Sequence, residues 1–198
     1  ELSGEVAIGA GETRSMTFLS RLRASFRQIH PLVRFRIYSA TADDVKQRLE
    51  CGLLDMGLLA EPVEVGRYAF WRMPEKDRWG VLVRKDAPLA RLMGVTPADL
   101  AGVPLLLSGR ERVQAELASW FGEYWNKLDV AATYNLILNA ANMVENGVGV
   151  AIGFDLGNFS DNLKFLPLLP GVETGTVLAW KRDQIFSAAV SQFHEYIQ

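Results

Sequence analysis

The sequence has very little of the side-chain chemistry that catalysis and metal binding use. Its 198 residues include one cysteine, Cys51, and two histidines, His30 and His194. A single cysteine excludes an internal disulfide and suits a reducing compartment such as the cytoplasm. Neither histidine has metal-ligand spacing, and no Gly-x-Ser-x-Gly motif is present. We therefore expect no metal, no cofactor and no catalytic residue, and interpret the chain as a binding protein rather than an enzyme.

Long apolar runs and an excess of basic residues are also missing. No stretch approaches the ~20 apolar residues that span a bilayer, and no signal peptide is visible, so we expect no membrane contact. Lysine and arginine together number 21, against 23 aspartate and glutamate residues. Because a domain that grips nucleic acid usually has a basic face, we expect no DNA or RNA contact from these residues.

What the sequence does contain is a regular alternation of strand and helix patterns. Residues 5–9 read as a strand, residues 16–30 as an amphipathic helix and residues 33–38 as a second strand. A helix ended by Gly52 and a buried strand opening at Asp55 follow. This β-α-β-α-β order predicts a parallel sheet, and small ligands bind at the carboxyl edge of such sheets.

The remainder of the chain continues the alternation. Further strands are predicted at residues 68–73, 79–84, 103–107, 131–134, 148–152, 163–168 and 176–180. Helices are predicted near residues 113–124, 136–146 and 186–197. Thr96 followed by Pro97 predicts a capped helical turn. The pattern favours an α/β fold of two units, the second inserted into the first.

In this order and spacing, the segments resemble the effector-binding domain of LysR-type transcriptional regulators. The matching pieces are residues 4–9, 26–33, 49–57, 82–83 with 87–90, 99–102 and 143–151. The resemblance implies two Rossmann-like lobes joined by two crossover segments, a type 2 periplasmic-binding-protein-like fold. Lobe I would comprise residues 4–82 and 156–198, and lobe II residues 83–155. The crossovers near residues 82–84 and 153–156 would act as hinges.

The resemblance also implies a function and partners. The domain would bind a small anionic metabolite in the interlobe cleft and relay that event through an oligomer. Homodimers would form through this domain, and tetramers in the full-length protein. The apolar stripe of helix 16–30 is either one dimer contact or packs on its own sheet, and Phe18 on a neighbouring face is the better interface candidate. DNA would be contacted only by an N-terminal domain that this chain lacks. The alternatives are a transporter's solute-binding protein with the same fold, and a transferase, which the absence of a paired base disfavours.

Candidate effector contacts in lobe I lie where two strands lead into helices. Thr13, Arg14 and Ser15 follow the first strand, where N–H groups and the helix dipole favour an anion. Two hydroxyls and a guanidinium could bind a carboxylate there; alternatively, a hydroxyl caps the helix and Arg14 faces water. Thr41 and Ala42 follow the second strand. The family often has a ligand-contacting hydroxyl at the position of Ala42. Thr41 either replaces that hydroxyl as a ligand contact or only caps the helix that follows.

Candidate contacts in lobe II are Ser108, Gly109, Arg110, Asn135, Gly153 and Phe154. Gly109 permits close approach of the backbone, and Arg110 is either a second anion partner or a solvated side chain. For Asn135, the N-cap of the next helix is the preferred interpretation, and a ligand contact is the alternative. Gly153 and Phe154 stand where the family usually has a strand leading into proline, which predicts an aromatic ring near the cleft.

Overall fold

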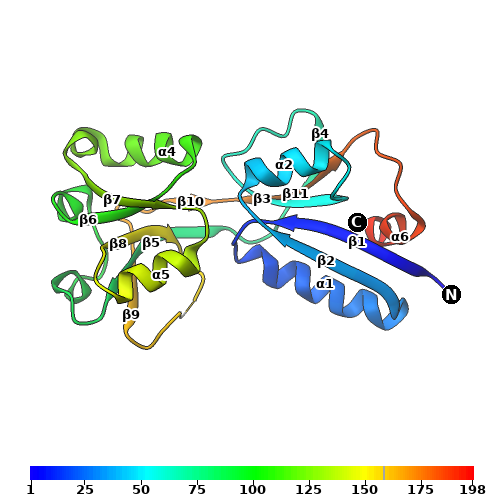
Figure 1. The fold of residues 1–198 in the computed structure, drawn as a ribbon, viewed down its shortest axis with the longest axis horizontal. Helices are drawn as coiled ribbons and strands as arrows, with labels where there is room; N and C mark the ends of the chain where they lie inside the picture. Colours follow the sequence, from blue (N-terminus) through cyan, green and yellow to red (C-terminus); the bar gives the residue numbers. More distant parts are fainter. Residues whose placement is uncertain (158) are drawn as a thin grey trace. The chain divides into compact units, whose positions relative to one another are not determined.

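The computed structural model describes residues 1–157 and 159–198 and divides into two compact units. Unit 1 comprises residues 1–76 and 175–198, and unit 2 comprises residues 77–174. The chain therefore passes into unit 2 between Lys76 and Asp77 and returns between Thr174 and Gly175. Figure 1 labels the elements of both units.

Unit 1 is a five-stranded sheet in the order β2-β1-β3-β11-β4. Its elements are β1 (Ser3–Ala10), α1 (Ser15–Ile29), β2 (Leu32–Ser39), α2 (Ala42–Glu50), β3 (Met56–Ala60), β4 (Tyr68–Arg72), β11 (Thr176–Lys181) and α6 (Ala188–Tyr196). β1 runs parallel to β2 and β3, whereas β11 runs antiparallel to β3 and β4. The predicted parallel sheet is thus present at the start of the chain.

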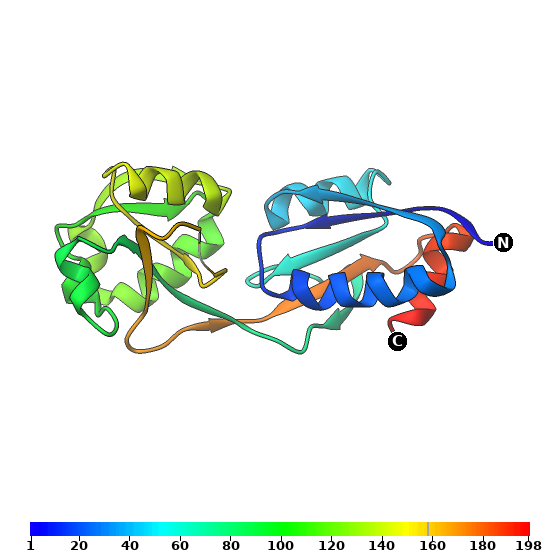
Figure 2. The ribbon, with the colours of Figure 1, turned by 90° about the horizontal axis from the view of Figure 1, so that it is seen from below.

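Helices cover both faces of the unit 1 sheet because successive strand residues point to opposite sides. Val6 and Ile8 of β1 pack with Phe26 of α1 and Phe193 of α6. Ala7, between them in sequence, packs in the cluster formed with α2. Figure 2 shows α1 and α2 on opposite sides of the strands. Because β1 is buried on both faces, it needs consecutive apolar residues rather than an alternation of apolar and polar ones.

Unit 2 is a second sheet in the order β10-β5-β8-β6-β7, with β9 also paired to β5. Its elements are β5 (Asp77–Arg84), the 3-10 helix η1 (Pro88–Arg91), α3 (Pro97–Leu100), β6 (Pro104–Ser108), α4 (Glu111–Phe121), the 3-10 helix η2 (Gly122–Lys127), β7 (Asp129–Tyr134), α5 (Ile137–Glu145), β8 (Val150–Phe154), β9 (Leu163–Pro167) and β10 (Glu173–Thr174). β6 runs parallel to β7 and β8, and β5 runs antiparallel to β8.

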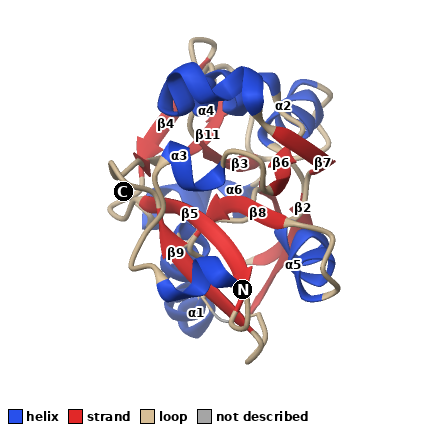
Figure 3. Ribbon diagram, turned by 90° about the vertical axis from the view of Figure 1, so that its left-hand side faces the viewer, coloured by secondary structure: helices blue, strands red, loops and turns tan. Residues whose placement is uncertain are grey.

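The unit 2 sheet is covered in the same way as the first. Leu105 and Leu107 of β6 pack in the cluster that contains Phe121 of α4. Leu106, on the other face, packs with Ile137 of α5. Figure 3 shows α4 and α5 on opposite sides of β6 and β8. Within the described residues, every helix is too short or too polar to cross a membrane.

The capped helical turn predicted at Thr96 is confirmed. Thr96 caps α3 in a reciprocal capping box with Asp99. Asp55 accepts a hydrogen bond from the Ala7 N–H at 2.7 Å, so its carboxylate ties the entry of β3 to β1. Thr41 is the N-cap residue of α2, but its side chain makes no capping hydrogen bond.

The two unit boundaries differ from those that the sequence predicts. The first crossover lies at residues 76–77 rather than near residues 82–84, and the second at residues 174–175 rather than near residues 153–156. The reason is strand pairing. All of β5 belongs to the unit 2 sheet, and β9 and β10 pair with β5, which keeps residues 156–174 in unit 2.

Candidate functional site

The carboxyl ends of β1, β2 and β3 are bound to one another in unit 1. The Gly11 N–H donates to the Leu58 carbonyl at 3.1 Å, and the Ala40 N–H donates to the Ala10 carbonyl at 3.1 Å. Because these bonds join the segments that follow the strands, the residues predicted after β1 and those predicted after β2 share one edge of the sheet.

Thr13 lies at this edge but uses its hydroxyl inside the unit. It is buried, and its Oγ1 accepts a hydrogen bond from the Ser15 N–H at 3.1 Å. The same oxygen lies 3.1 Å from Oγ1 of Thr176, which is also buried. Of the two roles predicted for Thr13, the local one at the helix start is therefore present in the structure.

The first N–H groups of α1 are already bonded within the protein. Besides Ser15, the Met16 N–H donates to the Thr13 carbonyl at 3.2 Å and the Thr17 N–H donates to the Arg14 carbonyl at 3.0 Å. The expectation of exposed N–H groups at this helix start is therefore wrong. The Ser15 hydroxyl, in contrast, is fully buried without a hydrogen-bond partner among the described residues, and the neighbouring Arg14 side chain is exposed.

The start of α2 offers less to an anion. Ala42 is 4% exposed and packs in the apolar cluster of that face, so its side chain belongs to the core. Asp43 and Asp44 occupy the first turn and already complement the positive end of the helix dipole. Thr41 is half-buried and its side chain makes no capping hydrogen bond. It is therefore the candidate ligand contact of this loop.

In unit 2, the loop after β6 has its own internal bonds. The Arg110 N–H donates to the Ser108 hydroxyl at 3.3 Å, and the Gly109 N–H donates to the Tyr134 carbonyl at 3.0 Å. Arg110 is the half-buried N-cap residue of α4. A Cβ built on Gly109 would meet no atom closer than 3.9 Å, so packing of the chain itself does not require glycine there.

At the end of β8, glycine is required by a neighbour. A Cβ on Gly153 would lie 2.8 Å from the Tyr134 hydroxyl, which donates to the Ile152 carbonyl at 2.6 Å. Asn135 is exposed and is not the N-cap of α5; that position belongs to Leu136, so the capping prediction is wrong by one residue.

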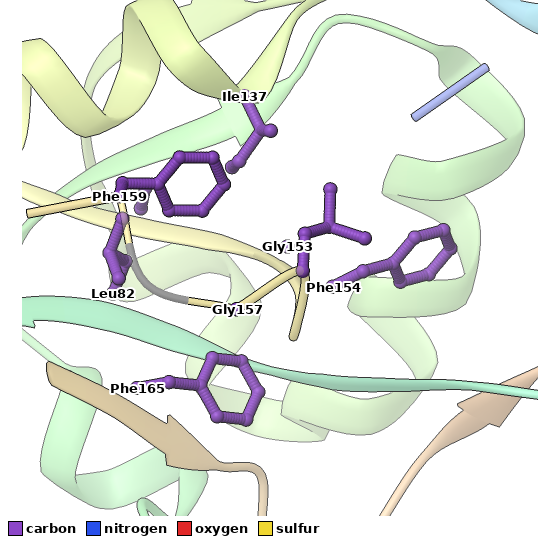
Figure 4. Close-up of a pocket in the computed structure, with 9 residues that line it drawn as sticks. Leu82, Ile137, Gly153, Phe154, Gly157, Phe159 and Phe165 are labelled. Carbon is purple, nitrogen blue, oxygen red and sulfur yellow. The ribbon is translucent and has the colours of Figure 1, made fainter. Parts of the chain in front are cut away.

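The Phe154 side chain is half-buried. Its ring meets the Trp79 ring edge-on at a centroid distance of 4.8 Å. Together with Gly153 it lines a small pocket whose nine residues include no polar side chain. The cavity volume is about 10 Å³, roughly that of one water molecule. Figure 4 shows this pocket.

The sequence interpretation did not find the other residues of this pocket, which include Leu82, Ile137, Ala151, Phe159 and Phe165. They come from β5, α5, β8, β9 and the loop after β8, so no short motif contains them. Among the described residues, no group of three or more His, Cys, Asp or Glu side chains is placed to hold a metal ion.

These features agree with the result of sequence comparison. A family model described as the LysR substrate binding domain matches residues 1–198. The chain belongs to this family. The resemblance inferred from the ordered motifs is thereby confirmed, as is the two-lobed α/β fold.

Named relatives are transcriptional regulators. The chain is 28% identical over 149 residues to the uncharacterized HTH-type regulator YvbU of Bacillus subtilis, covering 75% of this chain and 50% of YvbU. It is 24% identical over 189 residues to the Hca operon transcriptional activator HcaR of Escherichia coli, covering 91% of this chain and 63% of HcaR. The chain thus spans half to about two thirds of these relatives. Their identities favour a regulator's domain over a transporter protein or an enzyme.

Solved structures show the same fold. The effector binding domain of QuiR in complex with shikimate has a TM-score of 0.83 at 17% identity, covering 98% of this chain and 95% of that one. The cofactor-binding domain of the Cbl transcriptional regulator has a TM-score of 0.81 at 21% identity, covering 99% of this chain and 88% of that one. The chain therefore has the fold of these two domains.

Proposed function

We propose that this domain binds a small organic anion, and that both units carry candidate contacts. In unit 1 these are the Arg14 guanidinium and the hydroxyls of Ser15 and Thr41. In unit 2 they are the half-buried Arg110 and the exposed backbone at Gly109. Two guanidinium groups favour a carboxylate, because each can form a bidentate pair with it.

The observation that carries this proposal is the Ser15 hydroxyl. It is fully buried at the carboxyl edge of the parallel sheet and has no partner among the described residues. A buried polar group without a partner costs about 1–3 kcal/mol. A bound ligand that hydrogen-bonds this hydroxyl recovers that free energy only in the bound state, which makes binding selective for the arrangement that holds the ligand.

For the whole protein, we propose a cytoplasmic regulator in which effector binding alters contacts of a DNA-binding domain through an oligomer. The relatives named as transcriptional regulators support this. The edge formed by α1 and β2 supports dimerisation, since Ile29, Leu32 and Ile37 are 60%, 51% and 45% exposed. Phe18, the residue predicted for this contact, is instead half-buried against Trp71 at a centroid distance of 5.7 Å. Sedimentation compares the oligomeric state of the Ile37→Lys variant with that of the natural chain and so tests whether this edge forms the dimer contact.

The binding proposal is tested with a thermal-shift screen of small organic carboxylates that includes shikimate, followed by calorimetry with the best compound. A ligand at 100 times its Kd stabilises the native state by about 2.7 kcal/mol. Arg14→Ala and Arg110→Ala should each weaken binding about tenfold or more, because each removes a charge-assisted hydrogen bond. Arg21→Ala and Arg91→Ala, at exposed arginines of the two units, are the matched controls.

Ser15→Ala separates the binding role from a structural one. If its hydroxyl awaits a ligand, the variant loses affinity for the carboxylate while the free chain is as stable as the natural one or more so. No stabilising carboxylate at millimolar concentration, or unchanged affinity in both arginine variants, contradicts the proposed anion site.

A further inference from the structure

Strand β4 lies at one edge of the unit 1 sheet and pairs with β11 along its full length (Figure 1). The register is antiparallel and unbroken from Tyr68 to Arg72. In an antiparallel pair, successive residues direct their N–H and C=O groups alternately toward the partner strand and away from it. The Met73 N–H donates to the Thr176 carbonyl at 2.9 Å. Residues 69 and 71 therefore bond to β11 as well, whereas residues 68, 70 and 72 direct their backbone groups away from it.

The contacts of Tyr68 agree with this alternation. Its N–H donates to the Val65 carbonyl at 2.9 Å, and its carbonyl accepts a hydrogen bond from Nε of Arg182 at 3.2 Å. Among residues 1–157 and 159–198, no hydrogen bond reaches the outward backbone groups of Phe70 and Arg72. Two N–H groups and two carbonyls of this sheet edge are therefore available to an added strand.

The edge lacks most of the features by which proteins block strand addition. Those features include proline and lysine in the edge strand and β-bulges that twist it away. β4 contains no proline and no lysine, and its pairing with β11 has no register shift. At its centre, the Phe70 ring is 40% exposed and lies on the same face of the sheet as Tyr68 and Arg72. An added strand would therefore place a side chain directly opposite this exposed ring.

Arginine side chains surround the edge. Arg67 precedes β4, Arg72 ends it, and Arg182 is bonded to its first residue; all three are exposed. The acidic residues near them are Glu50, Glu61 and Asp183. The first accepts the hydrogen bond of the Tyr68 hydroxyl at 2.6 Å, and the second lies 3.6 Å from the Arg72 guanidinium. Residues 65–74 themselves contain no acid, so this edge is complementary in charge to an acidic segment.

We propose that β4 binds an extended acidic peptide of another protein as an additional strand. The backbone groups of Phe70 and Arg72 bond to the peptide, a β-branched side chain packs on the Phe70 ring, and carboxylates pair with the exposed arginines. A second copy of this chain fits less well. Antiparallel self-pairing centred on Phe70 would place Arg67 of each copy beside Arg72 of the other. The proposal concerns unit 1 alone and does not depend on the anion contacts proposed above.

The probe is the acetylated and amidated peptide Thr-Glu-Thr-Val-Thr-Glu-Thr, which reads the same in both directions and so fits either strand orientation. Amide NMR of the natural chain measures its binding. The Phe70 and Arg72 amides should exchange rapidly with water in the free chain and become protected when the peptide binds. The Trp71 amide, directed toward β11, should be protected in both states.

Two altered peptides separate the contributions of charge and backbone. Lysine in place of both glutamates should weaken binding about tenfold or more, because it brings cations to the exposed arginines. N-methylation of the valine removes the N–H that the Phe70 carbonyl would accept and should abolish binding. Equal binding of the lysine peptide would contradict an acidic partner, and equal binding of the N-methylated peptide would contradict strand addition.

Phe70→Pro removes the outward N–H at the centre of the edge without removing a bond to β11, and edge strands accommodate proline at such positions. Phe70→Ala is the matched control, because it loses the same ring but keeps the N–H. The proline variant should bind the peptide about tenfold more weakly than the alanine variant. Should the proline variant not fold, the N-methylated peptide with the natural chain decides.

Three further results would overturn the proposal. The first is no binding of the parent peptide at millimolar concentration. The second is equal affinity of the folded proline and alanine variants. The third is protection of the Phe70 and Arg72 amides in the free chain; if that protection increased with protein concentration, it would assign the edge to a second copy of the chain.

Discussion

Units 1 and 2 share an architecture but differ in what their sheets present at the carboxyl edge. In unit 1 the edge is polar and internally bonded, with Thr13 joined to Thr176 and the Ser15 hydroxyl left without a partner. In unit 2 the edge includes an apolar pocket beside Gly153. The comparison teaches that the parallel sheet fixes where a ligand can bind, whereas the residues that leave the strands fix its chemistry.

The sharpest way to test the independence of the two units is to destabilise one at a time. Phe26 is fully buried in unit 1 against the rings of His30, Phe35, Phe193 and Tyr196. Phe26→Ala should lower the free energy of unfolding by about 3–5 kcal/mol. Hydrogen exchange should then accelerate mainly in unit 1.

Phe121→Ala is the counterpart in unit 2, where that ring packs against Trp120 and Trp125. It should accelerate exchange mainly in unit 2. Phe70→Ala, at an exposed ring, should change stability by less than about 0.5 kcal/mol. If the two core variants gave identical hydrogen-exchange maps, the two units would unfold together and not independently.

A smaller effect is expected from the buried threonine pair of unit 1. Thr13→Val and Thr176→Val should each cost about 1–3 kcal/mol, because each leaves the partner hydroxyl short of a hydrogen bond. The double variant should cost less than the sum, since both hydroxyls are gone. Chemical denaturation measures all three. Thr174→Val breaks the Trp79–Thr174 bond of 2.6 Å in unit 2 and should be additive with Thr13→Val.

The smallest effect concerns Glu145, the last residue of α5 in unit 2. Hydrogen bonds from Asn162 and Ser160 hold the pKa of Glu145 below its usual 4.5. Because the folded pKa is the lower one, the contribution to stability is present above pH 4.5 and is lost as the pH falls through the folded value. Glu145→Gln should remove that part of the pH dependence, as followed by unfolding at pH 3 to 6.

Unit 1 has a comparable group for this test. A hydrogen bond from Tyr68 lowers the pKa of Glu50 in the same direction. Glu50→Gln should therefore flatten the same acid limb, as followed by unfolding at pH 3 to 6. A pH profile of the Glu145→Gln variant that matches the natural chain would show that the loop attachment contributes nothing there.

Much of the fold was predictable because it depends on local signals. The Thr96–Pro97 start of α3, the Gly52 end of α2 and the Asp55 entry into β3 each follow from neighbouring residues. The unit boundaries were not predictable, since they depend on β5 pairing with β9 and β10 far along the chain. Sequence distance conceals such pairings.

The candidate site divides in the same way. The sequence located Thr13, Ser15 and Arg110 at strand-to-helix junctions, where the structure places them. It could not show that Thr13 is already bonded to Thr176, 163 residues away. Nor could it show that Phe154 lies beside a pocket closed by Phe159 and Phe165, because these residues lie in three separate segments.

By itself, the sequence determined the order of strands and helices and the family, because periodicity, caps and ordered motifs are properties of neighbouring residues. Only the tertiary structure decided which polar groups are already satisfied and which remain for a ligand. Hydrogen-bond partners and cavity walls come from distant parts of the chain, and burial decides what an unpaired hydroxyl costs.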